Sequence, residues 1–276
     1  MPFMKNKYTV ESVVAELKKL LKEDIPEEFK DWARDGITFT DRNPEAEVQD
    51  YPNNIFNYIR GNSMPIRVRE LVEGILLEGI AAGDAIAANN LGALYYDGSI
   101  GEQSYRKAME YYKLGAEWGN EQALENLGYC YYYGRDTEVD YEKAFACFSK
   151  GAFLGRATSL YKIGDMYKRG YYVNQDEETA YRIYLRCIGL AVDDNEDSSA
   201  YDADVYVRYA DCLFSGSGCK KDVLEALYWA QRAEFEFRKR ILRCDSFARN
   251  GLFWAMNLIS KCRNALDDDS HASQTS

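Results

Sequence analysis

Residues 126–144 read NLGYCYYYGRDTEVDYEKA, and this stretch decides the fold because its pattern recurs along the chain. Glycines, tyrosines and alanines return in phase every 36 residues. They are Gly92, Gly128 and Gly164; Tyr95, Tyr131 and Tyr167; Gly98, Gly134 and Gly170; and Ala108, Ala144 and Ala180. A further copy follows after a longer interval, since Gly216, Asp222 and Ala226 continue the same columns. Such a period indicates a repeat protein.

Each repeat is predicted to contain two helices. Ala123, Leu127 and Tyr131 lie four residues apart and form one apolar stripe, and Gly134 follows where that helix should end. The second helix should begin at a column of good N-cap residues, whose oxygens accept otherwise unpaired backbone N–H groups. This column holds Ser104, Asp140, Asp176 and Asp222. The sequence therefore predicts a stack of antiparallel helix pairs.

These segments resemble Sel-1-like repeats, which are relatives of tetratricopeptide repeats. The resemblance covers residues 64–243 and is carried by the Leu-Gly, Tyr, Gly, Asp and Lys-Ala positions, as in Leu127-Gly128 and Lys143-Ala144. It implies an all-α fold, a right-handed α/α superhelical solenoid of helix-turn-helix repeats. Members of the resembled family usually act as adaptors that bind other proteins.

The ends of the chain lie outside the repeat phase. We expect residues 1–63 to form an N-terminal helical cap or a small appended domain, with helices at 9–22, 26–34 and 53–60, the second closed by Gly36. The segment 67–83 resembles a second helix alone, whose first helix the N-terminal segment should supply. Residues 244–266 should form a capping helix, and residues 267–276 a disordered tail.

Composition excludes several classes of function. The chain has 276 residues, and its 45 acidic against 34 basic residues give a formal net charge of −11, which disfavours nucleic acid as a partner. The single histidine, His271, lies in the polar tail, so histidine-based metal sites and catalytic triads are not expected. No apolar run is long enough for a membrane span, and Met1–Val10 lacks the apolar stretch of a signal peptide.

The cysteines are predicted to be reduced thiols in a cytoplasmic protein. There are seven, and none forms a Cys-x-x-Cys pair. Most fall at apolar positions of the repeat, so we interpret them as small buried side chains rather than redox or metal ligands. They are Cys130, Cys147, Cys187, Cys212, Cys219, Cys244 and Cys262. No cofactor is expected.

Two charged segments have alternative interpretations. Residues 193–204 place oxygen-bearing side chains at EF-hand-like spacing, but Ser198 and Asp204 replace the glycine and glutamate that a calcium loop needs, which favours a solvated loop. The basic residues Arg238, Lys239, Arg240 and Arg243 could contact nucleic acid, although an exposed helix face fits the acidic background better.

The outward face of each first helix is the predicted binding surface, lining a concave groove. Aromatic residues there would supply contact area, and carboxylates would select a basic partner. The alternative is that the tyrosines only pack between repeats. The predicted partner-binding residues are Asn89, Tyr96, Gln122, Glu125, Tyr129, Tyr132, Tyr161, Asp165, Lys168 and Asp211.

We therefore predict a non-catalytic protein-binding scaffold or adaptor, with a regulatory or immunity-type protein as one form of it. The alternative is a hydrolase of a cell-wall-related small molecule, because a β-lactamase-like activity is attached to some secreted relatives. The chain lacks a Ser-x-x-Lys motif with a supporting Lys-Thr-Gly, and it has neither a Walker-type loop nor a Gly-x-Gly-x-x-Gly turn. The sequence predicts neither the identity of the partner nor the oligomeric state.

Overall fold

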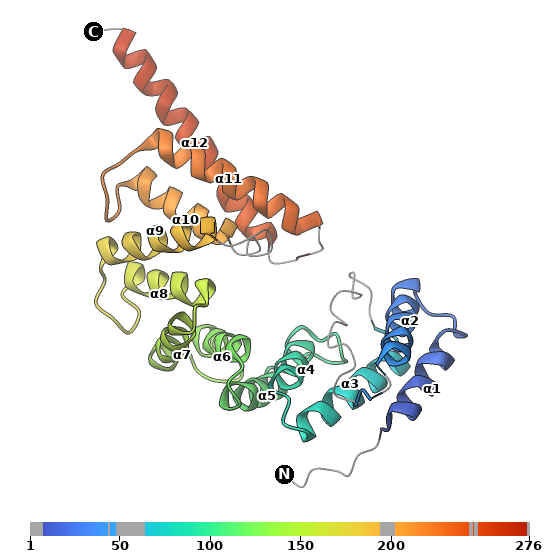
Figure 1. The fold of residues 1–276 in the computed structure, drawn as a ribbon. Helices are drawn as coiled ribbons and strands as arrows, with labels where there is room; N and C mark the ends of the chain where they lie inside the picture. The colour runs from blue at the N-terminus through green and yellow to red at the C-terminus, as the bar shows by residue number, and fades with distance from the viewer. Residues whose placement is uncertain are drawn as a thin grey trace. The chain divides into compact units, whose positions relative to one another are not determined.

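A computed structural model describes residues 8–43, 45–47, 64–193, 202–242, 245 and 248–274. Every regular element in these ranges is an α-helix (Figure 1). The helices are α1 (Val10–Leu20), α2 (Glu27–Arg42), α3 (Ile66–Ala81), α4 (Ala85–Asp97), α5 (Tyr105–Glu117), α6 (Glu121–Tyr133), α7 (Tyr141–Phe153), α8 (Ala157–Arg169), α9 (Glu177–Asp193), α10 (Asp202–Ser215), α11 (Val223–Leu242) and α12 (Ala248–Gln274). The predicted all-α solenoid class is confirmed.

The chain divides into two compact units, Met1–Cys147 and Phe148–Ser276. In the first unit α3 packs on α4, α4 on α5, and α5 on α6, while α4 also contacts α6. In the second unit the same succession runs from α8 to α12. Each unit has its own apolar core, because each helix buries one stripe against the preceding and following helices.

Local sequence sets the helix boundaries in the repeats. The side chain of Asn120 accepts a hydrogen bond from the Ala123 N–H and so caps α6. Gly134 ends α6 with a φ of 65°, in the left-handed region that favours glycine, and the Arg135 N–H donates to the Cys130 carbonyl at 2.9 Å. The four predicted N-caps are confirmed, since each accepts a hydrogen bond from the backbone N–H three residues later.

The N-terminal helices α1 and α2 pack against each other, and α1 also packs against α3. Thr9 and Ser12 form a reciprocal capping box at the start of α1. The helix α1 contacts α3, which contains most of the segment 67–83 whose first helix the N-terminal segment was expected to supply. The Tyr8 N–H donates to a carboxylate oxygen of Glu78 at 3.2 Å, and the Tyr8 ring lies over Gly74, the side chain of which is only a hydrogen.

The predicted end of the second helix at Gly36 is wrong, because α2 continues to Arg42. Gly36 lies on the same buried stripe as Phe29, Trp32 and Ala33, so burial of that face offsets the low helix propensity of glycine. The helix predicted at 53–60 lies outside the described residues.

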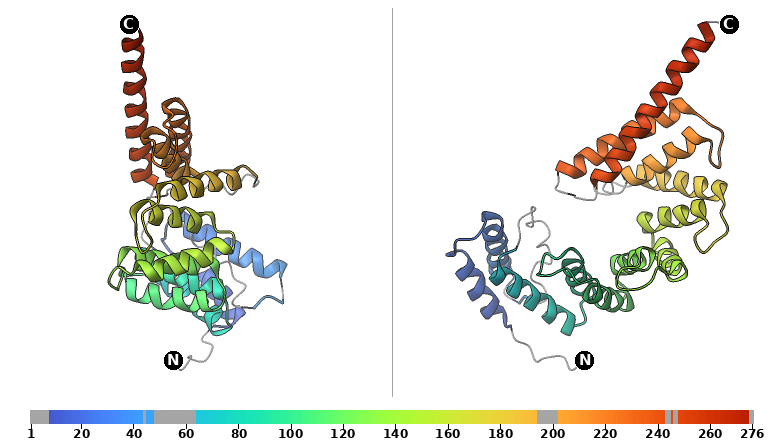
Figure 2. Two further views of the ribbon diagram at one scale, coloured as in Figure 1. Left: turned by 90° about the vertical axis from the view of Figure 1, so that its left-hand side faces the viewer. Right: turned by 180° about the vertical axis from the view of Figure 1, so that it is seen from behind.

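In the second unit, α11 and α12 lie side by side in both views of Figure 2. The helix α12 has 27 residues and continues past Leu266 to Gln274, where the sequence predicted a disordered tail. Its sequence contains no glycine or proline after Gly251, so nothing in the chain stops the helix earlier. Within the described residues, no helix is long and apolar enough to cross a membrane.

Candidate protein-binding surface

A half-exposed line of side chains runs along α6 in the first unit. Gln122, Asn126, Tyr129 and Tyr133 follow at helical spacing, so they share one face of this helix, while the neighbouring turns bury Leu127 and other core residues. The same repeat positions of α4 are Ile86, Asn90, Ala93 and Asp97, which are exposed or half-buried as well. We call these eight positions the first-helix stripe.

Side-chain amides join α4 to α6 along this stripe. The side-chain amide of Asn126 donates to the side-chain oxygen Oδ1 of Asn89 at 3.0 Å, and the side-chain amide of Gln122 donates to Oδ1 of Asn126 at 3.4 Å. The Asn89 amide donates in turn to Asn90 at 3.2 Å. Because every amide carries both donors and acceptors, the row can exchange hydrogen bonds with a polypeptide main chain.

Tyrosines continue the stripe at the end of α6. The rings of Tyr129 and Tyr133 are stacked with their centroids 6.2 Å apart, and Tyr133 is exposed. Tyr132 lies beside them but is buried, with edge contacts to Tyr133 at 4.9 Å and Tyr141 at 5.5 Å. Tyr129 and Tyr133 therefore offer contact area to a ligand, whereas Tyr132 holds the tyrosine pair in place.

Tyr96 belongs to a separate cluster between α4 and α5. Its ring lies 5.0 Å from Tyr105 and 6.5 Å from Tyr112, and burial raises its pKa above the ordinary value. The guanidinium of Arg135 lies 4.8 Å from the Tyr105 ring. Tyr96 thus packs against the second helix of its own repeat and is only half-exposed.

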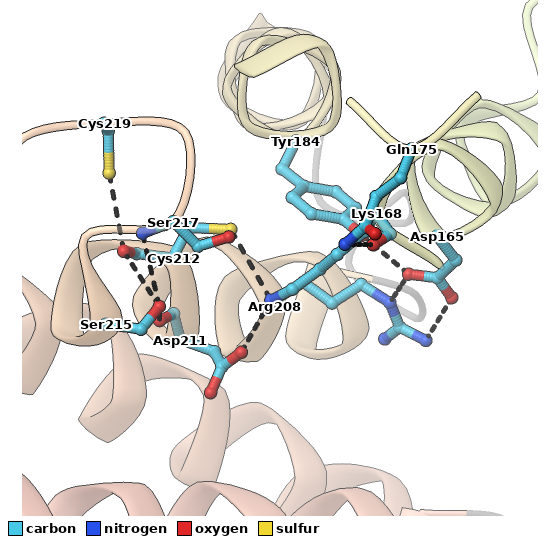
Figure 3. A network of polar contacts seen from close by, with 10 residues as sticks. All are labelled: Asp165, Lys168, Gln175, Tyr184, Arg208, Asp211, Cys212, Ser215, Ser217 and Cys219. Carbon is cyan, nitrogen blue, oxygen red and sulfur yellow. Dashed lines mark hydrogen bonds and ion pairs between the residues drawn. The ribbon is translucent and has the colours of Figure 1, made fainter. Parts of the chain in front are cut away.

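In the second unit, the positions equivalent to the stripe carry charges. Figure 3 shows Asp165 of α8, Tyr184 of α9 and Arg208 of α10 pointing toward one another. Two nitrogens of Arg208 donate to the two carboxylate oxygens of Asp165 at 2.7 and 2.9 Å, and the Tyr184 hydroxyl donates at 2.8 Å. The Lys162 ammonium lies 3.6 Å from the same carboxylate. Three consecutive helices are thus tied at one buried anion.

Burial alone would raise the pKa of Asp165, but the charge and hydrogen bonds of Arg208 lower this pKa to about 2. Burial and the neighbouring Asp165 charge raise the pKa of Tyr184 well above its ordinary value. Asp165 is therefore a carboxylate and Tyr184 a neutral phenol across the whole physiological pH range. Neither has a pKa suited to general acid–base catalysis near neutral pH.

The charge network extends from Arg208 to α11. Asp204 lies 3.5 Å from Arg208 and 2.6 Å from Arg240, and Arg240 also pairs with Asp245 at 2.8 Å. The helix α12 contacts this face, with the Trp254 ring centroid 5.5 Å from the Arg208 guanidinium. In the second unit, a helix of the chain itself therefore contacts the face that corresponds to the first-helix stripe.

A second ion pair lies next to this network on α8 and α10. The Lys168 ammonium donates to Asp211 at 2.7 Å and lies 3.8 Å from the Cys212 sulfur (Figure 3). Both charged side chains are half-buried. This pair lies nearer to solvent than the Asp165–Arg208 pair and stays accessible to a partner.

The structure thus divides the predicted binding residues into two classes. Half-exposed positions are Tyr96, Gln122, Tyr129, Lys168 and Asp211. Buried positions are Asn89, Glu125, Tyr132, Tyr161 and Asp165, so their predicted exposure on a groove is wrong. On α6 the exposed line keeps the predicted Gln122 and Tyr129 but passes through Asn126 and Tyr133 instead of Glu125 and Tyr132, because the i+3 and i+4 neighbours of a residue lie on either side of the same helix line.

Sequence reasoning missed Asn90, Asn126 and Tyr133 on the stripe, and it missed Arg208. The two asparagines precede the Leu-Gly step of the repeat, so their position beside a buried leucine was an available signal. Arg208 had no such signal, because its partner Asp165 lies 43 residues away in sequence.

The other candidate sites have simpler explanations. Six cysteines lie within the described residues, and four of them, Cys130, Cys187, Cys212 and Cys262, are buried as predicted. In the basic segment, Arg238 pairs with Glu234 and Lys239 with Glu236. The described residues do not include the side chains of residues 193–201, which form most of the EF-hand-like segment. They also do not include those of Arg243 and Cys244.

Comparison with known proteins agrees with this architecture. The Sel1 repeat model matches residues 85–120, 121–155, 157–186 and 203–234. A Sel1 repeat protein from Oxalobacter formigenes superposes with a TM-score of 0.61 at 22% identity, over 90% of this chain and 86% of that one. A protective antigen of uropathogenic Escherichia coli with an SLR fold has a TM-score of 0.52 at 18% identity, over 94% and 54% of the two chains. At these identities the likeness concerns the fold. None of the curated proteins matches the chain.

Proposed function

Because this chain belongs to the Sel1-like repeat family, whose repeats generally serve as protein-interaction scaffolds, we propose that it is a non-catalytic adaptor. In this proposal, a segment of a partner protein binds along the first-helix stripe of the first unit.

The row of amides and tyrosines on α4 and α6 carries the proposal. The hydrogen bond of 3.0 Å from Asn126 to Asn89 aligns the amides of two adjacent helices, which fixes their donors and acceptors before a ligand arrives. The stacked Tyr129 and Tyr133 would then supply apolar contact area with little loss of side-chain freedom. Hydrogen bonds to a main chain and aromatic anchors together suit a protein segment better than a small metabolite.

The second unit supports this mode of binding by analogy. There, Trp254 of α12 lies against Arg208, at a position equivalent to the stripe. The faces of first helices in this chain are therefore compatible with a bound helix, and we propose an amphipathic helix or an extended segment as the ligand in the first unit.

Charge favours a basic partner. The chain carries a net charge of −11, and two acidic residues are exposed there, Asp97 on the stripe and Glu121 next to it. Asp211 remains accessible in the second unit, whereas Asp165 and Glu125 are buried and do not contribute. Electrostatic attraction would mainly raise the association rate, so binding should weaken with added salt. Buried thiols such as Cys130 and Cys187 favour a cytoplasmic location, where a dedicated regulatory or immunity-type pairing is one form of the adaptor role.

The hydrolase alternative would use a Ser-x-x-Lys spacing, which occurs at Ser159–Lys162, at Ser217–Lys220 and, in the first unit, at Ser104–Lys107. The Ser104 hydroxyl caps α5 by accepting from the Lys107 N–H, while the Lys107 ammonium contacts the Tyr95 hydroxyl at 3.3 Å. Each group thus has a structural partner, which weighs against a serine nucleophile activated by this lysine.

Capture of partners from the native lysate, followed by direct titration of the captured protein, tests the proposal. We expect the double variant Gln122→Ala/Tyr129→Ala to weaken binding at least tenfold, since two central contacts are removed. Tyr172→Ala is a matched control, because Tyr172 is an exposed tyrosine of the second unit. Unchanged affinity in a folded double variant would reject the stripe, and hydrolysis of a generic lactam by the purified chain would favour the enzyme.

A further inference from the structure

The helix α11 exposes a line of large apolar side chains to solvent. Leu224 is 68% exposed, Tyr228 53%, Phe235 61% and Leu242 84%. The opposite face of the helix is the one buried in the second unit, through Ala226, Ala230, Ala233 and Phe237. A surface helix normally carries polar residues on the side away from its core, whereas α11 has a second, exposed apolar face in addition to its buried one.

The spacing of this line matches the contact seam of a coiled coil. Alternate steps of four and three residues connect Leu224, Tyr228, Gln231, Phe235, Arg238 and Leu242. Such a seam faces a second helix along its whole length, whereas the 3.6-residue period of a helix packed on a globular core drifts away from it. The line runs along nearly the whole of the 20-residue helix α11, so the second helix should be of similar length.

Neighbouring side chains hold this seam in a fixed shape. The Arg232 guanidinium lies 5.2 Å from the Tyr206 ring and 5.4 Å from the Trp229 ring, and it also contacts Tyr228. The Tyr228 and Trp229 rings meet edge to face at 5.3 Å. Between Tyr228 and Phe235 lies an open hollow of about 350 Å³, large enough to receive a side chain of a facing helix.

The seam is complementary to itself in an antiparallel pairing. A two-fold axis beside Ala233 brings Leu224 opposite Leu242 of a second copy, so the two most exposed leucines cover each other. It brings Tyr228 opposite Arg238 of that copy, a favourable cation–π arrangement, and Phe235 opposite Gln231. Along one edge, Glu225 faces Lys239 of the second copy, so charges of opposite sign meet twice in the pair, while near the axis Arg232 and Glu234 each face their own counterpart.

We propose that α11 of a second copy of this chain packs antiparallel on this seam and forms a homodimer. Met256 of α12 widens the apolar surface, since it is exposed and lies 4.0 Å from an Arg238 nitrogen. A contact between two helices of about 30 Å is at the lower end of specific interfaces, near 1,200 Å² in total. We therefore expect a dissociation constant in the micromolar range.

Sedimentation velocity of the full chain from about 1 to about 200 μM tests the proposal, because it spans the expected dissociation constant. Wild type should shift from monomer to dimer over this range, and Phe235→Glu should stay monomeric throughout. Leu185→Glu is the matched control, since Leu185 is an exposed leucine of α9, and it should dimerise like wild type. A monomeric wild type at every concentration would overturn the proposal, as would a dimer unaffected by Phe235→Glu.

A mixing experiment tests the antiparallel arrangement. Leu224→Glu and Leu242→Lys should each weaken the dimer, whereas an equimolar mixture should restore it, since one layer then pairs Glu with Lys and the other keeps both leucines. If mixing restores nothing, the antiparallel pairing is overturned. If wild type is monomeric and captures a protein that the Phe235→Glu variant no longer captures, the seam binds a different partner, and the homodimer is likewise rejected.

Discussion

Replacing Asp165 with asparagine would test how the buried charge network holds the second unit together. The carboxylate accepts hydrogen bonds from Arg208 at 2.7 and 2.9 Å and from Tyr184 at 2.8 Å. Its side chain is 9% exposed and that of Arg208 is 12% exposed. Asparagine keeps the size of the side chain but removes its charge, so the Arg208 guanidinium would stay buried with Asp204 as its remaining carboxylate neighbour at 3.5 Å.

The lowered pKa gives the scale of the effect. A decrease from the ordinary value of 3.8 to about 2 corresponds to about 2 kcal/mol of favourable interaction of the ionised form. Removing one partner of a buried ion pair costs about 3–5 kcal/mol in other proteins, because the remaining charge is left uncompensated. We therefore expect Asp165→Asn to lower the free energy of unfolding by about 2–4 kcal/mol at pH 7.

The sign of the pH dependence follows from the same pKa. Because the folded pKa of Asp165 lies below the unfolded one, its contribution is complete above pH 3.8 and is lost as the pH falls toward about 2. The asparagine variant does not titrate at this position. The difference in unfolding free energy between wild type and variant should therefore narrow by about 2 kcal/mol between pH 5 and pH 2.

Urea unfolding followed by circular dichroism and tryptophan fluorescence measures this difference. Trp254, one of four tryptophans in the chain, lies 5.5 Å from the Arg208 guanidinium, so part of the fluorescence reports on the network. Asp211→Asn is the matched control, because Asp211 occupies the same column one repeat later and its pair with Lys168 is half-exposed; it should cost less than about 1 kcal/mol. The reasoning is refuted if Asp165→Asn costs no more than the control, or if its deficit is as large at pH 2 as at pH 7.

Two further predictions concern packing and thiol chemistry. Gly92→Ala should lower the free energy of unfolding by about 1–3 kcal/mol, because a Cβ there would lie 2.7 Å from the Tyr112 ring. In the control Gly189→Ala, the added Cβ meets nothing within 4 Å, so this variant should be neutral or stabilised by up to about 1 kcal/mol. Chemical denaturation of both variants measures the difference. Burial raises the pKa of Cys130 and Cys187 to about 12. At pH 8, both thiols should therefore react with a thiol-exchange reagent at least about 100-fold more slowly in the native chain than in the chain unfolded in urea. Mass spectrometry of the labelled peptides measures both rates.

The fold could be read from the sequence because its determinants are local and repeated. Each first helix ends at a glycine such as Gly134, and each second helix begins at a capping residue such as Asp140, so the boundaries depend on chemistry within a few residues. The helix α2 departs from this rule at Gly36, where burial of a stripe outweighs the propensity of one residue.

The candidate site was only half predicted. Gln122 and Tyr129 lie on the stripe as expected, but Glu125 and Tyr132 are buried, because a one-residue step turns a helix face by about 100° and the repeat period does not say which side meets the next helix. The function of the stripe stays a proposal, as does the division of the chain into cap, repeats, capping helix and tail.

The sequence by itself determined the repeat, the helix pairs, their caps and the class of the solenoid, since all of these follow from spacing and from hydrogen bonds within a few residues. The tertiary structure alone decided which polar side chains are buried and with whom. Asp165 and Arg208 meet from helices 43 residues apart, and the exposed seam of α11 is visible only once its opposite face is seen to be buried. The physical reason is that burial and charge pairing depend on neighbours in space, which a local pattern does not encode.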